Sequence, residues 1–152
     1  MRRAFLFLPL VFALGPASAQ EAFTVEIIQE VEMPRDKIYD NALLWLSESF
    51  RSSKAVIDLK DRDLGTIIGN AADEIKIGWG ATLPISYKLR IDVRDNRYRL
   101  TFSNVTVHTA FGLRPIEQTN RDVTESGSRE RFTSLADSFR AYLTSAAKGS
   151  TW

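Results

Sequence analysis

Few residues in this chain have the chemistry of a catalytic or metal-binding centre. His108 is the single histidine, and cysteine is absent from the 152 residues. One histidine does not make a multi-histidine metal site, and no G-x-S-x-G motif accompanies it to indicate a Ser-His-Asp triad. We therefore interpret His108 as a structural or exposed residue, and we expect no catalytic residue, no metal, no cofactor and no disulfide.

Two groups of carboxylates are the next candidates. Asp58, Asp61 and Asp63 surround an expected turn, but they lack the length and the final bidentate glutamate of a calcium loop. Aspartates at turn positions accept hydrogen bonds from nearby backbone amides, and we favour this interpretation. Asp73 and Glu74 are adjacent in the sequence. A hydrolase can use two carboxylates only if the fold gives them opposed environments.

Basic side chains form the strongest charge pattern in the chain. They alternate with apolar residues over 86–107 and are Lys88, Arg90, Arg94, Arg97 and Arg99. A basic stripe on a sheet can bind nucleic acid, but Asp92 and Asp95 interrupt this one, and few outward aromatic residues accompany it to stack on bases. We expect cross-strand charge pairing on a solvated face, with no nucleic acid as partner.

One aromatic residue stands between two glycines. Trp79 follows Gly78 and precedes Gly80, within a segment from Ala71 to Pro84 that we expect to be a strand extension followed by a flexible loop. A tryptophan on a loop can anchor a partner, because its side chain buries a large apolar area and donates an N–H. It can equally fold back onto the sheet. We hypothesise that Trp79, with Gly78 and Gly80, lines a site for a protein partner or a small apolar ligand.

A hairpin of two long strands is expected to position these candidates. Apolar and polar residues alternate from Ile85 to Val93 and again from Tyr98 to Phe102, which is typical of strands with one buried face. A two-residue loop at Asp95-Asn96 sets the register. The expected cross-strand pairs are Val93 with Tyr98, Ile91 with Leu100, Leu89 with Phe102, and Asp92 with Arg99. The apolar positions then change parity, which predicts a β-bulge near Ser103-Asn104.

The remaining elements follow from periodicity and turn residues. A strand is expected from Phe23 to Met33, and a helix with one apolar stripe from Lys37 to Ser52, in which Trp45 packs on the sheet. Two strands follow at 54–60 and 65–70. Residues 109–128 are expected to form a long connection, and a final helix to run from an N-cap at Ser128 to Lys148-Gly149. The predicted order is β-α-β-β-β-β-α.

Several short motifs within this order resemble those of a known family. They are Tyr39 and Trp45, Lys54 to Ile57, Asp61 with Gly65 and Ile67, Tyr87 to Val93, and Arg97 to Leu100. These motifs are similar to those of exported bacterial domains of unknown function (domain of unknown function 4468), which are described as having a TATA-binding-protein-like fold. The resemblance covers Phe23 to about Leu143.

The resemblance implies an α+β fold in which one curved antiparallel sheet carries two helices on one face. It implies no catalytic residue, because none is assigned in the family. Many members of the family look like lipoproteins, whereas this sequence has no cysteine that could be acylated.

The first residues of the chain have the pattern of an export signal. Arg2 and Arg3 precede an apolar run from Ala4 to Leu14, and Ala17-Ser18-Ala19 fits the small-residue rule for cleavage. We predict a signal peptide at 1–19 and one exported domain at 20–152, with its core at about 23–147, in the periplasm or secreted. The apolar run is shorter than the roughly 20 residues of a membrane span.

Cleavage at this site changes the net charge of the chain. Loss of Arg2 and Arg3 lowers the Lys and Arg count from 20 to 18 against 19 acidic residues, so the formal charge moves from +1 to −1. A near-neutral domain has no general field that holds nucleic acid or anionic lipid.

Three functions remain open at this point. The first is a non-catalytic binding or interaction module in the periplasm or cell envelope, which uses the open face of the sheet or the Trp79 loop. The second is a small hydrolase that depends on carboxylates such as Asp73 and Glu74. The third is a structural component of an envelope assembly, which would expose an apolar patch at a sheet edge. We favour the first, and the sequence leaves the ligand, partner and oligomeric state open.

Overall fold

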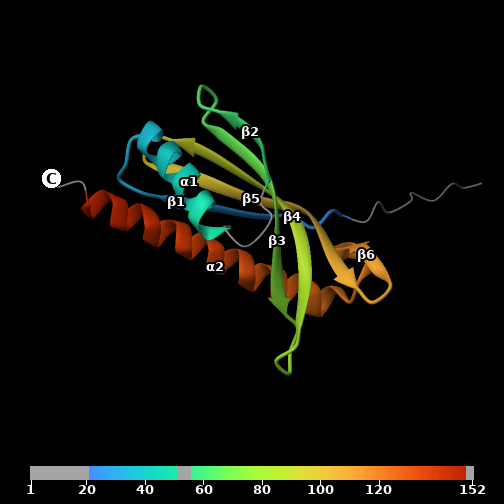
Figure 1. The fold of residues 1–152 in the computed structure, drawn as a ribbon. Helices are drawn as coiled ribbons and strands as arrows, with labels where there is room; N and C mark the ends of the chain where they lie inside the picture. Colours follow the sequence, from blue (N-terminus) through green and yellow to red (C-terminus); the bar gives the residue numbers. More distant parts are fainter. Residues whose placement is uncertain (1–20, 51–55, 150–152) are drawn as a thin grey trace, which may run out of the picture.

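A computed structural model describes residues 21–50 and 56–149 of the chain. The predicted signal peptide at 1–19 and the predicted strand start at Lys54 lie outside the described residues. Figure 1 shows a curved antiparallel sheet with two helices on one of its faces, so the predicted α+β class is confirmed.

The elements in chain order are β1 (Val25–Glu30), α1 (Arg35–Ser49), β2 (Val56–Asp61), β3 (Thr66–Lys76), β4 (Thr82–Arg94), β5 (Arg97–Thr109), β6 (Gly112–Pro115), the short 3-10 helix η1 (Ile116–Gln118) and α2 (Arg121–Lys148).

The central hairpin β4–β5 has the register that the sequence predicts. Val93 lies opposite Tyr98, Leu89 opposite Phe102 and Asp92 opposite Arg99. Asn96 adopts φ 61° in the two-residue loop, a left-handed conformation that asparagine tolerates better than most residues. The apolar side chains of both strands consequently face the helices, and their charged side chains face away.

The predicted bulge is also present. Ser86 lies opposite Thr106, while Lys88 lies opposite Ser103, so β5 has one extra residue between these two pairs. Asn104 has φ 52°, and the bulge returns Val105 and Val107 to the buried face. It allows β5 to keep contributing to the core along its whole length.

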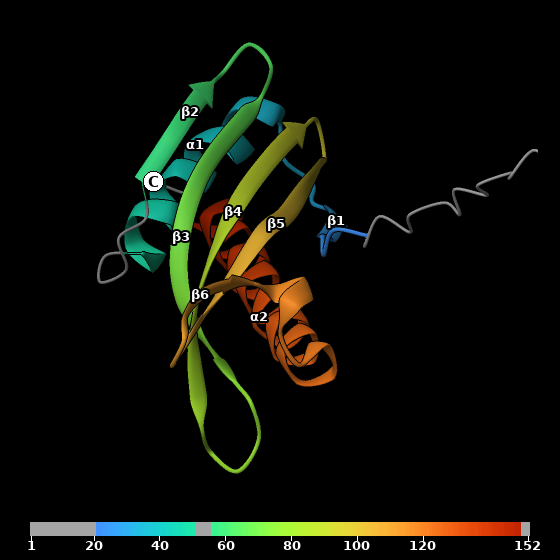
Figure 2. The ribbon, with the colours of Figure 1, turned by 90° about the vertical axis from the view of Figure 1, so that its right-hand side faces the viewer.

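The sheet order is β1-β5-β4-β3-β2, and β6 also pairs with β5. Strand β2 pairs only with residues 66–70 of β3, and β5 pairs with β4 from Ile85 onward. The far end of the β3–β4 hairpin is therefore only two strands wide. Figure 2 shows this end projecting beyond the rest of the sheet.

The segment from Ala71 to Pro84 is mostly strand, so the expected strand extension is present and the expected loop is shorter than predicted. Strand β3 continues to Lys76 and β4 starts at Thr82. Asp73 interrupts the alternation of apolar residues along β3, because it lies on the helix-facing side of the strand, where an apolar residue would be expected. Its Oδ2 lies 2.6 Å from Nε of Arg131 in α2, and the ion pair makes the partly buried carboxylate tolerable.

Helix α2 begins at Arg121, and Ser128 is therefore not its N-cap as predicted. Ser128 is fully buried inside the helix. A Cβ on Gly127 would lie 2.6 Å from the carbonyl oxygen of Lys76, so this glycine allows the helix to approach β3 closely. The predicted long connection at 109–128 instead contains β6, η1 and the first two turns of α2. Gly149 caps the helix at its predicted end.

Helix α1 buries the predicted apolar stripe, and Trp45 contacts the second helix. Its ring lies 4.8 Å from the ring of Phe139 in α2, and its Nε1 donates a hydrogen bond of 3.2 Å to Ser138. Trp45 thus joins the two helices. The predicted end of this helix at Ser52 lies outside the described residues, and α1 ends at Ser49.

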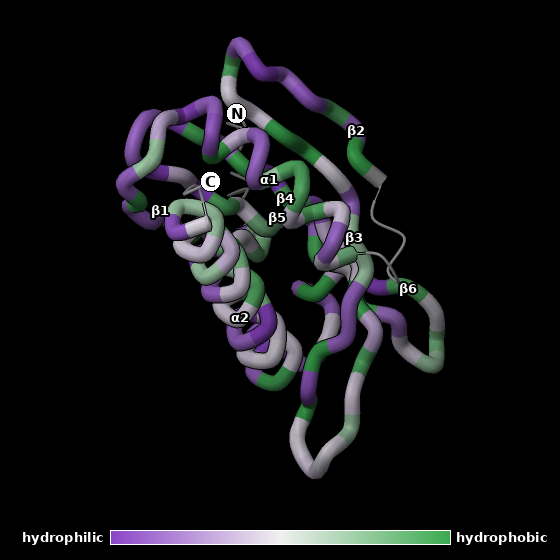
Figure 3. Tube along the Cα trace, turned by 60° about the vertical axis from the view of Figure 1, so that its left-hand side comes forward, coloured by the Kyte–Doolittle hydropathy of each residue, from purple (hydrophilic) through white to green (hydrophobic). Residues whose placement is uncertain are grey.

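Aromatic rings fill the space between α2 and the sheet. Phe132 stacks on Phe102 with ring centroids 4.2 Å apart, and Phe139 meets Tyr98 edge-on at 4.7 Å. Figure 3 shows hydrophobic and hydrophilic positions alternating along α2. Burial raises the pKa of Tyr98 to about 12.

Neither helix of the described residues has the length and apolar composition of a membrane-spanning segment.

Two buried tyrosines should respond in opposite ways to loss of their hydroxyl groups. Tyr87 Oη is buried with no hydrogen-bond partner in the described part of the chain, whereas Tyr98 Oη donates to Gln29. An unpaired buried hydroxyl costs on the order of 1–3 kcal/mol, and a hydrogen bond contributes about 1 kcal/mol. Tyr87→Phe should therefore raise the free energy of unfolding by about 1 kcal/mol and Tyr98→Phe should lower it by about 1 kcal/mol, measured by urea denaturation. Equal destabilisation by both variants would contradict this packing.

Candidate functional site

His108 lies on the face of the sheet that no helix covers. Its Nε2 lies 2.9 Å from Oγ of Ser86 on the neighbouring strand. The sequence did not predict this pair, although both residues fall on the outward parity of their strands. A working triad also needs a third group to orient the imidazole. In the described residues, Ser86 is the only recorded partner of His108, so we do not assign the pair a catalytic role.

Two aspartates of the β2–β3 hairpin accept hydrogen bonds from within that hairpin. Asp61 Oδ1 accepts a hydrogen bond of 2.9 Å from the Leu64 amide, as expected for an aspartate in a turn. Asp58 accepts a hydrogen bond from the Asn70 side chain. No group of three metal-ligating side chains occurs among residues 21–50 and 56–149.

Asp73 and Glu74 do not form a catalytic pair. They are consecutive in β3, so their side chains leave opposite faces of the strand. Asp73 is held by Arg131 on the helix side, and Glu74 is exposed. A general acid and base must face one reacting group, and this arrangement does not support the carboxylate-dependent hydrolase.

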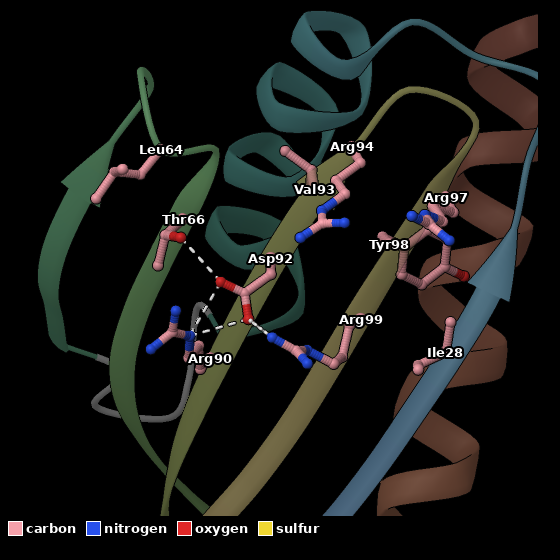
Figure 4. A pocket seen from close by; sticks show the side chains of 10 residues that line it. All are labelled: Ile28, Leu64, Thr66, Arg90, Asp92, Val93, Arg94, Arg97, Tyr98 and Arg99. Carbon is pink, nitrogen blue, oxygen red and sulfur yellow. Dashed lines mark hydrogen bonds and ion pairs between the residues drawn. The ribbon is translucent and has the colours of Figure 1, made fainter.

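A charged cluster centred on Asp92 occupies the uncovered face near the β4–β5 turn. The carboxylate accepts hydrogen bonds from Thr66 Oγ1 at 2.8 Å, from Arg90 Nε at 2.9 Å and from Arg99 Nη2 at 3.0 Å. Figure 4 shows these three donors around it. The predicted Asp92–Arg99 contact is confirmed, and Arg90 and Thr66 are additional partners that strand register alone did not indicate.

Burial opposes ionisation of Asp92, but the hydrogen bonds from Arg90, Thr66 and Arg99 outweigh it and lower the pKa of this carboxyl. The charge pairing on this face is nevertheless less complete than predicted. Arg90 and Arg99 share the carboxylate of Asp92. Within the described residues, Lys88, Arg94 and Arg97 form no side-chain hydrogen bond or ion pair.

A hollow of about 390 Å³ lies over this cluster. Four arginines and a single carboxylate line it, with Ile28 and Leu64 among its apolar lining residues, as Figure 4 shows. It is within the size range of small-molecule sites, roughly 300–1,000 Å³. By contrast, an apolar cavity between α1 and strands β2 to β4 measures only about 180 Å³.

The turn that contains Trp79 closes the projecting end of the β3–β4 hairpin. The Ile77 amide donates to the Ala81 carbonyl at 3.0 Å, so the turn is tight rather than a long loop. Gly78, Trp79 and Gly80 have φ values of 90°, 49° and 76°. A left-handed conformation is costly for a bulky residue such as tryptophan. The Trp79 side chain is fully exposed and does not fold back onto the sheet.

An apolar groove of about 530 Å³ lies beside this turn. Ile77 and Leu83 from the hairpin, Phe111 from the β5–β6 turn and Val123 from the first turn of α2 are among its lining residues. Phe111 is 87% exposed. We call these four side chains together with Trp79 the apolar tip. The sequence indicated Trp79 through its flanking glycines, but it did not indicate the four groove residues, which the fold brings together. Trp79 lies in the adjoining turn and is not itself a lining residue of the groove.

The architecture defines an α+β domain with a TBP-like fold. The chain belongs to the family described as a domain of unknown function (DUF4468) with TBP-like fold, whose family model matches residues 25–108. The match spans β1 through most of β5, so the predicted family is confirmed. The residues after 108, which include β6 and α2, lie outside the match.

Two solved structures share this fold. A TBP-like protein from Parabacteroides distasonis ATCC 8503 has a TM-score of 0.62 and 16% identity, with 82% of this chain and 96% of that chain covered. A DUF4468 family protein from Bacteroides ovatus ATCC 8483 has a TM-score of 0.58 and 15% identity, with 85% of this chain and 87% of that chain covered. At these identities the similarity shows the fold alone. No curated protein matches the sequence.

The Asp92 cluster makes a prediction about acid stability. Because the pKa of this carboxyl is lower in the folded chain than its ordinary value of 3.8, its contribution is complete above about pH 4 and is lost as pH falls through the folded-state pKa. Asp92→Asn should lower the free energy of unfolding at pH 7 by about 1 kcal/mol and remove this part of the acid dependence.

Carbon-detected NMR of the Asp92 carboxyl provides the direct measurement. The titration midpoint should lie below 3.8 and should move upward in Thr66→Val, which deletes one donor to the carboxylate. A midpoint at or above 3.8 in the unaltered protein would show that the three donors do not hold the carboxylate as described.

Proposed function

We propose that this protein is a non-catalytic binding module, exported to the periplasm or cell envelope, that binds a protein partner through its apolar tip. Trp79 is the anchor of this surface, and Gly78 and Gly80 hold it out from the hairpin. The observation that carries the proposal is the composition of the groove beside Trp79. Among its eleven lining residues, Arg114 is the single charged one.

The scarcity of charged residues matches the core of a protein interface; five of the eleven lining residues are apolar and five are uncharged polar ones. Interface cores are depleted in charged residues and enriched in aromatic ones, and a few large side chains supply most of the binding energy. Trp79 and Phe111 come from two different turns and are both exposed. Exposed apolar side chains that gather at one place mark interaction surfaces, whereas scattered ones do not.

The backbone at Trp79 supports the same conclusion. Asparagine or glycine would adopt the left-handed conformation at this position at lower cost than tryptophan. The fully exposed side chain makes no compensating buried contact. A strained backbone that presents an exposed aromatic ring is typical of a functional position.

A protein partner fits this surface better than a small apolar ligand. The groove lies between the hairpin, the end of β5, the β5–β6 turn and the start of α2. Trp79 stands fully exposed beside it, whereas small-molecule sites bury most of the ligand surface. The groove volume of about 530 Å³ is within the size range of ligand sites, so the distinction rests on the full exposure of Trp79 rather than on volume. The separate apolar cavity under α1 measures about 180 Å³, below the roughly 300 Å³ of a typical ligand site.

Substitution of Trp79 should abolish partner binding without affecting the fold. Trp79→Ala removes no buried area, so the free energy of unfolding should change by less than about 0.5 kcal/mol. Residues 20–152 carrying an affinity tag would be cross-linked in native envelopes, and the captured proteins quantified by mass spectrometry. A partner specific to the tip should fall at least tenfold for Trp79→Ala and for Phe111→Ala.

Leu64→Ala is the matched control, because Leu64 is 72% exposed but lies in the turn between β2 and β3. It should capture the same partner at the unaltered level. A partner retained by both tip variants, or lost equally in Leu64→Ala, would refute the apolar tip as the binding surface.

A further inference from the structure

We infer that the hollow over Asp92 is a binding site for a small organic anion whose phosphate or carboxylate groups are held between Arg94 and Arg97. This site is separate from the apolar tip. It lies on the uncovered face beside the β4–β5 turn, whereas the apolar tip lies at the far end of the β3–β4 hairpin.

The first argument is the direct opposition of two positive charges. Arg94 and Arg97 are cross-strand neighbours at the last pair before the hairpin loop. Like charges placed directly opposite each other destabilise a strand pair. Both side chains are exposed and neither has a recorded partner in the described residues. An oxyanion between the two guanidinium groups would replace this repulsion with two charge-assisted hydrogen bonds.

The second argument is that Asp92 is already fully engaged. It accepts hydrogen bonds from Thr66, Arg90 and Arg99, so it has little capacity to neutralise further cations. Within the hollow, four arginines and one carboxylate leave a lining charge of +3. Arg99 Nε is buried without a hydrogen-bond partner in the described part of the chain, which leaves one more donor in the cluster.

Nearby acidic residues reduce this positive charge but do not cancel it at the hollow. Glu26 Oε2 lies 3.7 Å from Arg99 Nη1, and Glu30 lies opposite Arg97 in the β1–β5 register. Both belong to β1, at one edge of the sheet, and neither lines the hollow. Arg94 and Arg97 also line an adjoining hollow with Glu30, Glu32 and Asp95, and none of these three carboxylates lines the hollow over Asp92.

The size and lining of the hollow indicate the class of ligand. A volume of about 390 Å³ holds a small molecule rather than a polymer. Ile28 and Leu64, both exposed, line the hollow as well and can contact an apolar or sugar portion of the ligand. Nucleic acid would need a longer basic track and exposed aromatic rings. We therefore expect a phosphorylated or carboxylated metabolite of modest size.

Titration of the 20–152 chain with two probes, inorganic pyrophosphate and citrate, followed by amide NMR shifts, tests this inference and separates the two anion types. At least one probe should bind saturably and shift the amides of Arg94 and Arg97. The double variant Arg94→Gln/Arg97→Gln should weaken binding at least tenfold.

The control is Lys88→Gln/Lys60→Gln, which removes the same amount of charge without touching the hollow. It should weaken binding less than twofold. Equal weakening in both double variants, or no saturable binding of either probe, would overturn the site. Trp79→Ala should bind the probe as the unaltered protein does, so failure of the anion site and failure of the apolar tip can be distinguished.

Discussion

The packing of α2 across the sheet is the interaction on which the rest of the structure depends. Phe132 stacks on Phe102 of β5, and Phe139 contacts both Tyr98 and Trp45, so one helix joins the sheet to α1. Full burial of such side chains contributes roughly 1.5–3 kcal/mol each. This packing decides which face of the sheet is covered. It thereby leaves the charged face exposed, and the first turns of α2 lie beside the projecting end of the β3–β4 hairpin.

The central hairpin could be predicted from the sequence because its information is local. A two-residue loop and a period of two fix both the register and the buried face. The start of α2 could not be predicted in this way. Its sheet-facing positions are Thr124, Gly127 and Ser128, which interrupt the apolar period, and Gly127 is explained only by its approach to Lys76 of β3. The length of the β3 extension could not be fixed for a related reason, since Asp73 occupies a partly buried position that Arg131 makes tolerable.

The candidate sites also contain some residues that the sequence could predict and others that only the fold reveals. Trp79 could be singled out from its glycine neighbours. The groove beside its turn takes Phe111 from the β5–β6 turn and Val123 from α2, and the sequence did not indicate either. The basic stripe could be seen in the sequence, and so could one of its ion pairs. What the sequence did not show is that Arg90 and Arg99 share Asp92, so that Arg94 and Arg97 are left facing each other. Such sharing depends on side-chain geometry across three strands.

Site-specific photo-cross-linking in intact cells tests most directly whether the apolar tip is the binding surface. A photoreactive phenylalanine derivative would replace Trp79 in one strain and Leu64 in another, since both side chains are exposed but lie in different turns. The proposed function predicts one discrete cross-linked product from position 79, which an excess of unlabelled 20–152 chain suppresses, and no such product from position 64. Absence of a product from position 79, or the same product from both positions, would contradict it.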